Sequence, residues 1–176
     1  GGVTFTYEGN WKLQLENCSD NYHFTSANPS YIRLLERRKA AEAAAQGPGF
    51  VSAMDAQRHW SGEDDGIVSG TFSFANGHVL NFGIAAPSAA SPLFERSDWL
   101  AQHLGEAKRD WIFNMRNLTL FPNMQVAENA SSQLRVIEPI SPSLTRMRTW
   151  CIGPKGESAA ARRQRIRQYE DFFNPS

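Results

Sequence analysis

Cysteine is scarce in this sequence, and so are net charge and long hydrophobic runs. Only Cys18 and Cys151 occur among 176 residues, too few for a disulfide framework, a cysteine-based zinc site or an iron–sulfur cluster. Basic and acidic residues balance at 18 each, so electrostatics do not support a general role in binding nucleic acid or anionic membranes. No apolar run approaches the roughly 18 residues of a membrane span, and the first residues are not a signal peptide. We therefore expect a cytoplasmic protein with no nucleic-acid or membrane partner.

The composition is that of an ordinary globular protein, with 41% hydrophobic and 11% aromatic residues. The length suits one domain covering residues 1–176, and such a chain buries about 70% of its unfolded surface. The sequence enters a strand pattern without an initial methionine and stops in a turn-like Asn174-Pro175-Ser176. Both ends are therefore expected to be cut from a longer protein.

Hydrophobic spacing and turn residues predict an α+β domain in which an antiparallel sheet is covered by a long C-terminal helix. Asn76-Gly77 is the strongest turn signal and predicts a hairpin over 67–85. Asn10 and Ser97 are candidate helix caps. The predicted strands cover 3–7, 117–129, 131–142 and 144–156, and the predicted helices cover 11–23, 30–46, 97–116 and 157–173. In the last helix, one apolar stripe holds Ile166, Tyr169 and Phe173.

Three polar residues recur at intervals of three near the start of the chain: Asn17, Asp20 and His23. On a helix this spacing places them near one face. One interpretation is an ordinary i,i+3 pair between Asp20 and His23. The other is a redox metal site in which His23 is a ligand and Asp20 forms a hydrogen bond outward to a partner. Spacing alone does not choose between the two.

The remaining histidines and the arginine run favour structural roles. Metal sites need clusters of ligands, so isolated histidines are expected to be surface or structural side chains. These are His59, His78 and His103. The arginine run of the last predicted helix is expected to be a solvated face or an oligomer contact. It comprises Arg162, Arg163, Arg165 and Arg167.

The stretch "GNWKLQLENCSDNYHFTSANPSY" resembles the start of the catalytic domain of Rieske-type aromatic-ring-hydroxylating dioxygenase large (alpha) subunits. That family carries Asn-Trp-Lys, a Glu-Asn pair, and then Asp-x-Tyr-His-x4-His. The resemblance continues through "NLTLFPNMQV", "LRVIEPISPSLTRMRTWCIGPKGES" and "RRQRIRQYEDFFNPS", and so spans nearly the whole chain. The later stretches are most similar to the branch that acts on benzoate, anthranilate and halobenzoates.

The resemblance implies a mononuclear iron site of two histidines and one carboxylate. His23 matches the first ligand. Asn28 stands where the second histidine is expected, and a neutral amide oxygen is a weaker ligand than imidazole. The family pattern places the carboxylate beyond residue 176; Glu170 and Asp171 are near in sequence but do not match it.

The resemblance also implies roles for side chains around the metal. Asp20 matches the residue that bridges electron flow from a Rieske histidine of a neighbouring alpha subunit to His23. Asn17 belongs to the matched Glu-Asn pair and is grouped with Asp20 as a catalytic candidate. Phe121 and Asn123 are expected to line the substrate pocket, although the same residues fit a strand that crosses a core. No residue is assigned to a substrate carboxylate.

The implied fold is the helix-grip (START-like) type, with an antiparallel sheet curved around a long C-terminal helix. The implied enzyme takes electrons from NADH through a reductase and a Rieske [2Fe-2S] cluster. Mononuclear Fe(II) then places both atoms of dioxygen on an aromatic carboxylate as a cis-diol. Its expected assembly is a trimeric alpha3 or alpha3beta3 complex with a small beta subunit.

Two cysteines cannot supply the Cys-x-His and Cys-x-x-His pairs of a Rieske cluster. The chain is therefore expected to be a truncated catalytic domain without a Rieske domain, and inactive by itself. The alternative is a catalytically incompetent helix-grip module that only binds a ligand, which Asn28 and the missing carboxylate favour for this piece.

Overall fold

The computed structural model describes residues 2–20, 23, 29–46, 69–84, 89, 91–129 and 131–173. Asn28 and His59 lie outside these residues. Among the helices described, none is both long and apolar enough to span a membrane.

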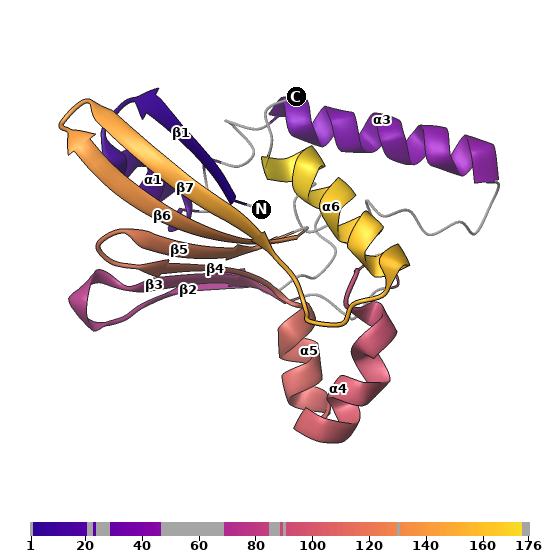
Figure 1. Cartoon of the computed structure of the whole chain (residues 1–176). Coiled ribbons are helices and arrows are strands. Elements are labelled where there is room, and N and C mark those ends of the chain that lie inside the picture. Colours follow the sequence, from indigo (N-terminus) through magenta and orange to yellow (C-terminus); the bar gives the residue numbers. More distant parts are fainter. Residues whose placement is uncertain are drawn as a thin grey trace.

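Seven strands form one antiparallel sheet in the order β1-β7-β6-β5-β4-β3-β2 (Figure 1). The antiparallel sheet predicted from the sequence is confirmed. Every strand from β3 to β7 pairs with its neighbour in the chain. Short turns join β4 to β7 in succession, whereas the connection from β3 to β4 contains the helical segments at residues 94–96, 97–104 and 106–113. The strands are β1 (Gly2–Glu8), β2 (Ser69–Ser73), β3 (Val79–Gly83), β4 (Met115–Leu120), β5 (Met124–Glu128), β6 (Ser132–Ser141) and β7 (Leu144–Ile152).

The β2–β3 hairpin turns at the predicted residues. Asn76 and Gly77 have φ values of 63° and 80° within the short 3-10 turn η2 (Ala75–Gly77). These are left-handed conformations that asparagine and glycine adopt most readily. The single strand predicted over 117–129 is wrong, because the chain turns at 121–123 and returns as β5.

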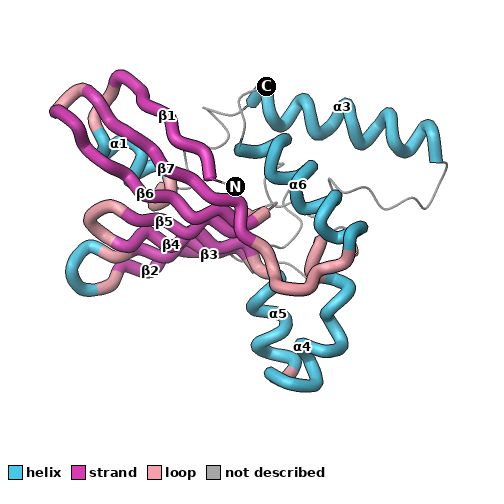
Figure 2. Tube along the Cα trace, in the orientation of Figure 1, coloured by secondary structure: helices cyan, strands magenta, loops and turns pink. Residues whose placement is uncertain are grey.

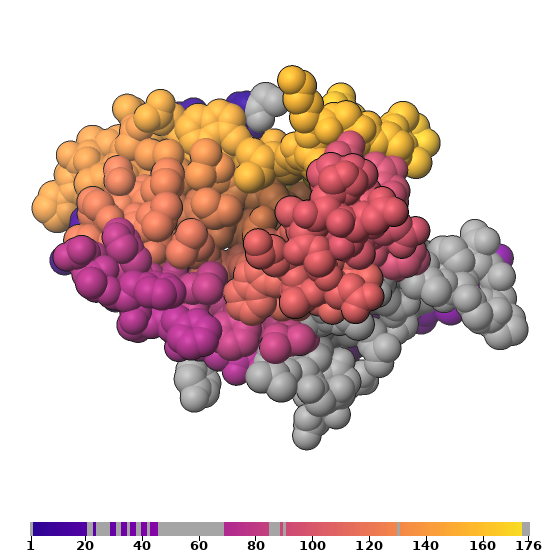
Figure 3. Space-filling model, turned by 90° about the horizontal axis from the view of Figure 1, so that it is seen from below, coloured from indigo at the N-terminus to yellow at the C-terminus, as the bar shows by residue number. Residues whose placement is uncertain are grey.

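The helices are α1 (Trp11–Asn17), α3 (Pro29–Gln46), α4 (Ser97–Leu104), α5 (Glu106–Phe113) and α6 (Ala159–Phe173), with the 3-10 turn η3 (Phe94–Arg96) before α4. Figure 2 shows α4, α5 and α6 beyond one end of the strands. In Figure 3 the α4–α5 pair lies beside the β2–β3 hairpin on one face of the molecule.

The helix predicted over 97–116 is wrong in its length and its cap. Gly105, at φ 83°, separates α4 from α5, because a left-handed residue cannot continue a right-handed helix. Ser97 is the first residue of α4 rather than its cap, and the capping position is Arg96. Residues from Met115 onward belong to β4.

Helix α6 confirms the predicted long C-terminal helix, but its buried stripe differs from the predicted one. The buried residues are Ala161, Gln168 and Tyr169, whereas Ile166 is 41% exposed. Tyr169 accepts a hydrogen bond from Nε2 of Gln133 on β6 at 2.8 Å. A polar contact with the sheet therefore fixes the rotation of α6 that an apolar pattern alone did not predict.

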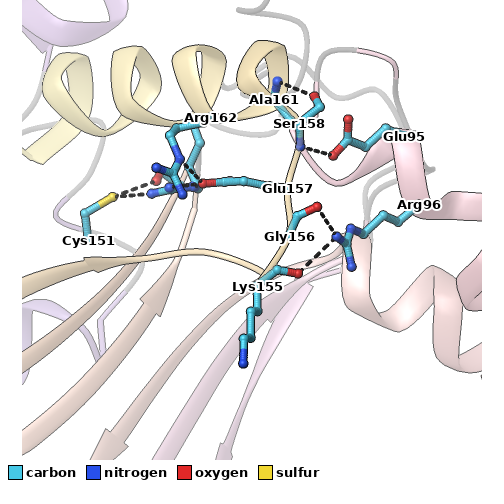
Figure 4. A network of polar contacts seen from close by, with 11 residues as sticks. Glu95, Arg96, Cys151, Lys155, Gly156, Glu157, Ser158, Ala161 and Arg162 are labelled. Atoms are coloured by element: carbon cyan, nitrogen blue, oxygen red, sulfur yellow. Dashed lines mark hydrogen bonds and ion pairs between the residues drawn. The ribbon is translucent and has the colours of Figure 1, made fainter.

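The entry to α6 is held by charge-assisted hydrogen bonds (Figure 4). Glu157 is 2% exposed at its side chain and accepts from Nε of Arg165 at 2.8 Å. The Arg165 hydrogen bond, with a further one from Arg162, lowers the pKa of Glu157 against the opposing effect of burial. The same bond with Glu157 raises the pKa of Arg165. The interpretation of the arginine run as a solvated face is therefore wrong at Arg165.

The loop before α6 is also tied to η3. Ser158 caps α6, since its Oγ accepts from the N–H of Ala161 at 3.0 Å. Its own N–H donates to Glu95 at 3.0 Å, and hydrogen bonds from the Ser158 side chain and then its backbone lower the pKa of Glu95. Arg96 donates to the carbonyl oxygens of Lys155 and Gly156 at 3.1 and 2.7 Å.

One face of the sheet is buried but unusually polar. At alternate strand positions it carries amides and hydroxyls that are at most 7% exposed. These residues are Asn81, Asn117, Thr119, Gln125, Gln133, Thr145 and Thr149. Buried amides need hydrogen-bond partners, and two of them, Gln125 and Asn81, find these partners in the backbone of α1 and of Cys18, which follows it.

Candidate metal centre

Helix α1 is anchored at its start by Asn10. The side-chain oxygen of Asn10 accepts from the N–H of Lys12 at 3.1 Å, which is the capping role predicted from the sequence. Its amide nitrogen donates to the carbonyl of Pro142, in the turn between β6 and β7, at 2.9 Å. One side chain thus both starts the helix and attaches it to the sheet.

The other end of α1 is held by amides of the buried sheet face. Gln125 Nε2 donates to the carbonyls of Gln14 and Leu15 at 3.1 and 3.0 Å. Asn81 Nδ2 donates to the carbonyl of Cys18 at 2.9 Å. The last carbonyls of a helix lack backbone partners, and here the sheet supplies them.

This docking explains why the continuous helix predicted over 11–23 is wrong. Helix α1 ends at Asn17, and Cys18 is its capping residue. The Oγ of Ser19 donates to the carbonyl of Leu15 at 3.2 Å and also contacts Thr119 Oγ1 at 3.2 Å. Side chains therefore satisfy carbonyls that a continuing helix would pair with its own amides.

The structure brings Asn17, Asp20 and His23 together. His23 Nδ1 lies 3.5 Å from Oδ2 of Asp20, and His23 Nε2 lies 3.0 Å from Nδ2 of Asn17. Because the Asn17 amide can only donate through Nδ2, both contacts favour the tautomer with its proton on Nδ1. His23 is 26% exposed and Asp20 is 46% exposed at the side chain, so the group is open to solvent at Asp20.

In this tautomer Nε2 carries the lone pair through which His23 can bind a metal. The Nδ1–H group points to a carboxylate, as it does in many metal-ligating histidines. Within the described part of the chain, no group of three or more His, Cys, Asp and Glu could hold a metal ion. The described residues therefore fit an iron at one ligand position, His23, and do not complete its coordination.

The other predicted site residues stand apart from this group or outside the described residues. Phe121 and Asn123 lie in the β4–β5 turn. The Phe121 ring is 47% exposed, with its centroid 6.4 Å from that of Trp11. The carbonyl of Asn123 accepts from the N–H of Ile137 at 2.8 Å. Their pocket-lining role stays a prediction, as does the role of Asn28.

Sequence reasoning missed the residues that position this group. Asn81 and Gln125 fix the end of α1, yet each is a single polar residue within an otherwise ordinary strand pattern. The available signal was the presence of Asn117, Thr119 and Gln125 at the core-facing positions of β4 and β5. Such positions normally carry apolar side chains. Their partners are backbone atoms 63 and 110 or more residues away, so no local pattern identified them.

Residues 2–175 match the model of the family described as "Ring hydroxylating alpha subunit (catalytic domain)". The chain belongs to this family. The match covers the strands, the helices and the His23 group alike, so the whole described fold is that of a ring-hydroxylating alpha-subunit catalytic domain.

Curated relatives of the ring-hydroxylating domain are large subunits of dioxygenases. It is 40% identical over 177 aligned residues to toluate 1,2-dioxygenase subunit alpha of Pseudomonas putida, covering all of this chain and 37% of that protein. It is 37% identical to the 2-halobenzoate 1,2-dioxygenase large subunit of Burkholderia cepacia, covering 36% of that protein. It is 36% identical to the anthranilate 1,2-dioxygenase large subunit of Acinetobacter baylyi, covering 37% of that protein. The chain thus spans just over a third of the length of these relatives.

Solved structures of naphthalene 1,2-dioxygenase share the fold. One, with indole bound in the active site, superposes with a TM-score of 0.70 at 18% identity, covering 99% of this chain and 38% of that one. A variant bound to phenanthrene gives a TM-score of 0.66 at 18% identity, covering 97% and 37%. The predicted α+β helix-grip fold is confirmed by this likeness.

Proposed function

We propose that this ring-hydroxylating domain binds ferrous iron and an aromatic carboxylate, within an enzyme that adds dioxygen to the ring as a cis-diol. The observation that carries the proposal is the position of His23 between Asn17 and Asp20, on a chain 40% identical throughout its length to a toluate dioxygenase subunit. The relatives' names describe dioxygenases of toluate, 2-halobenzoate and anthranilate. The alternative of a non-catalytic ligand-binding module is therefore not favoured.

In this proposal His23 supplies one iron ligand through Nε2. Asn28 stands at the second ligand position with a weaker amide donor, and the third ligand lies beyond residue 176. The bound iron supplies dioxygen activation. Asp20 holds the proton on Nδ1 of His23 and, being 46% exposed, faces the Rieske domain of a neighbouring alpha subunit. Asn17 donates to the same Nε2, and iron binding would displace this hydrogen bond.

The proposed electron path runs from NADH through a reductase and a Rieske [2Fe-2S] cluster to this domain. The proposed assembly is alpha3 or alpha3beta3, with the cluster of one alpha subunit facing Asp20 of the next. Cys18 and Cys151 are both free thiols and cannot form a cluster by themselves. The isolated 176-residue chain is therefore expected to be inactive.

The test uses the full-length protein that contains this chain, loaded anaerobically with ferrous iron. With benzoate, NADH and a reductase, we expect a cis-diol that carries both atoms of labelled dioxygen. His23→Ala is expected to lose iron and product, while His103→Ala serves as the matched control because His103 is exposed and bonded only within α4. Failure to hydroxylate any aromatic substrate would contradict the proposal.

The Asn28 ligand is tested separately by metal analysis of Asn28→His in the same protein. Loss of a residue that supports a metal ligand typically costs about 10- to 100-fold in metal affinity. Replacement of a histidine ligand by a weaker donor should cost at least as much. We therefore expect Asn28→His to bind iron at least tenfold more tightly. Equal affinity in the two proteins would show that the native site is not weakened by Asn28.

A further inference from the structure

Arg135 occupies the middle of the buried, polar face of the sheet. It lies on β6 between Gln133 and Ile137, which are 3% and 0% exposed and point to the same face. Its partners in register are Gln125 on β5 and Thr149 on β7. Arg135 is therefore a partly exposed cation placed among buried neutral side chains.

The contacts of Arg135 join the end of α1 to the end of α6. Its Nη1 lies 3.4 Å from Sγ of Cys18, and its Cζ lies 5.2 Å from the centroid of the Phe173 ring. Its Nε donates to Oε1 of Gln133, whose amide nitrogen in turn donates to Tyr169. The cation–π contact with Phe173 and the Gln133 hydrogen bond hold the guanidinium in place.

The charge of Arg135 is not matched within the described part of the chain. Among the described residues, each hydrogen bond of Arg135 goes to a neutral oxygen or a sulfur, and no carboxylate pairs with it. Other arginines of the sheet and of α6 do pair with carboxylates. These are Arg116 with Glu128, Arg146 and Arg148 with Glu138, Arg165 with Glu157, and Arg167 with Asp171.

A partly buried cation is costly unless an anion or water satisfies it. The described hydrogen bonds of Arg135 use Nε and Nη1, which leaves Nη2 without a partner among the described residues. A guanidinium presents parallel N–H groups whose geometry matches a carboxylate. The chemistry that completes Arg135 is therefore that of a carboxylate.

Arg135 also contacts a residue that adjoins the His23 group in the chain. It contacts Cys18, the residue after Asn17, and the Asn17 amide contacts His23. The Phe173 ring beside the guanidinium offers an apolar surface of the kind that an aromatic ring packs against.

We propose that Arg135 binds the carboxylate of the aromatic substrate and thereby selects benzoate-type acids over neutral rings. The inference rests on the proposed function, because it assumes that the substrate lies between His23 and α6. Arg135 acts as a binding and orienting residue: it fixes the carboxylate end, which determines the part of the ring presented towards His23.

The test measures equilibrium binding of benzoate and of benzamide, its neutral analogue, to the full-length protein by calorimetry. A hydrogen bond to a charged group is worth about 1.5–3 kcal/mol, and 1.4 kcal/mol is a factor of ten. Arg135→Gln is therefore expected to weaken benzoate binding about 10- to 100-fold and benzamide binding by less than about threefold. Arg135→Lys keeps the positive charge but loses the paired N–H groups of the guanidinium. Its affinity for benzoate is expected to lie between those of Arg135→Gln and wild type.

Arg148→Gln is the matched control, because Arg148 sits on the opposite, exposed face of β7 and pairs with Glu138. It is expected to leave both affinities unchanged. The proposal is overturned if Arg135→Gln binds benzoate within about threefold of wild type, or if it loses benzoate and benzamide equally. If Arg135→Gln does not fold, the benzoate-to-benzamide ratio of Arg135→Lys decides in the same way.

Hydroxylation of toluene, a neutral ring, separates this inference from the proposed function. If wild type hydroxylates toluene but binds benzoate no better than benzamide, the function stands and the role of Arg135 is wrong. If wild type hydroxylates no ring while Arg135→Gln selectively loses benzoate binding, the role of Arg135 stands and the function is wrong.

Discussion

Asn17 donates from Nδ2 to Nε2 of His23 over 3.0 Å, so the nitrogen available to a metal is already engaged by an amide. On the other side of the ring, Nδ1 faces Asp20. The two contacts, one at each ring nitrogen, select the tautomer with its proton on Nδ1. They orient the imidazole before a metal arrives, and they also give the metal a hydrogen bond to displace.

Asp20→Ala removes the group that faces Nδ1 of His23. Since a carboxylate behind a metal-ligating histidine typically contributes about 10- to 100-fold in affinity, we expect ferrous affinity of the full-length protein to fall by that factor. Anaerobic metal titration measures it. Asp98→Ala, in the first turn of α4, is the control, and an unchanged affinity in Asp20→Ala would mean that Asp20 does not support His23.

Gln125→Leu removes both hydrogen bonds that the sheet donates to the Gln14 and Leu15 carbonyls. Ser19 still donates to the Leu15 carbonyl, whereas the Gln14 carbonyl loses its sheet partner. An unsatisfied carbonyl costs about 1–3 kcal/mol, so local opening at the end of α1 should become easier. Hydrogen exchange should show faster exchange of the Ser19 and Asp20 amides, which donate to the carbonyl of Glu16. Gln102→Leu on the exposed face of α4 should leave those amides unaffected.

Glu157→Gln weakens the buried pair with Arg165 and should lower stability at neutral pH by about 1.5–3 kcal/mol, the usual value of a hydrogen bond to a charged group. The folded-state pKa of Glu157 lies below its ordinary value of 4.5. Its contribution is therefore fully present above about pH 4.5 and is lost as the pH falls through the lower, folded-state pKa.

Urea midpoints of wild type and Glu157→Gln should accordingly differ at pH 7 and converge as the pH is lowered below 4.5. Glu138→Gln is the matched control, since Glu138 pairs with two arginines but is 29% exposed, and exposed pairs contribute little. A gap between wild type and Glu157→Gln that does not narrow in acid would contradict the assignment to ionised Glu157.

Gly105→Ala tests the break between α4 and α5. Gly105 has φ 83°, and an added Cβ would meet no atom within 4 Å. The cost is therefore purely conformational, about 1–2 kcal/mol for a left-handed residue with a side chain. Thermal unfolding should show a lower midpoint, whereas Ala101→Gly, within α4, should show the smaller loss of about 1 kcal/mol expected from helix propensity.

Local patterns were sufficient where a feature depends on neighbouring residues. Asn76-Gly77 determined a hairpin turn because both residues tolerate positive φ. Asn10 determined the start of α1 because its side chain reaches an amide two residues away. The spacing of Asp20 and His23 predicted a contact that needs only one turn of backbone.

Only the tertiary structure decided the features whose partners are distant in sequence. The end of α1 depends on Gln125 and Asn81, which reach it through strand register. The burial of Arg165 depends on its contacts with Glu157 and with Cys151 on β7. The contacts of Arg135 with Cys18 and Phe173 join segments that are far apart in the sequence. The hydrophobic periodicity of a sequence indicates which residues share a face of a helix or strand. The partner that each residue contacts depends on the long-range pairing of strands.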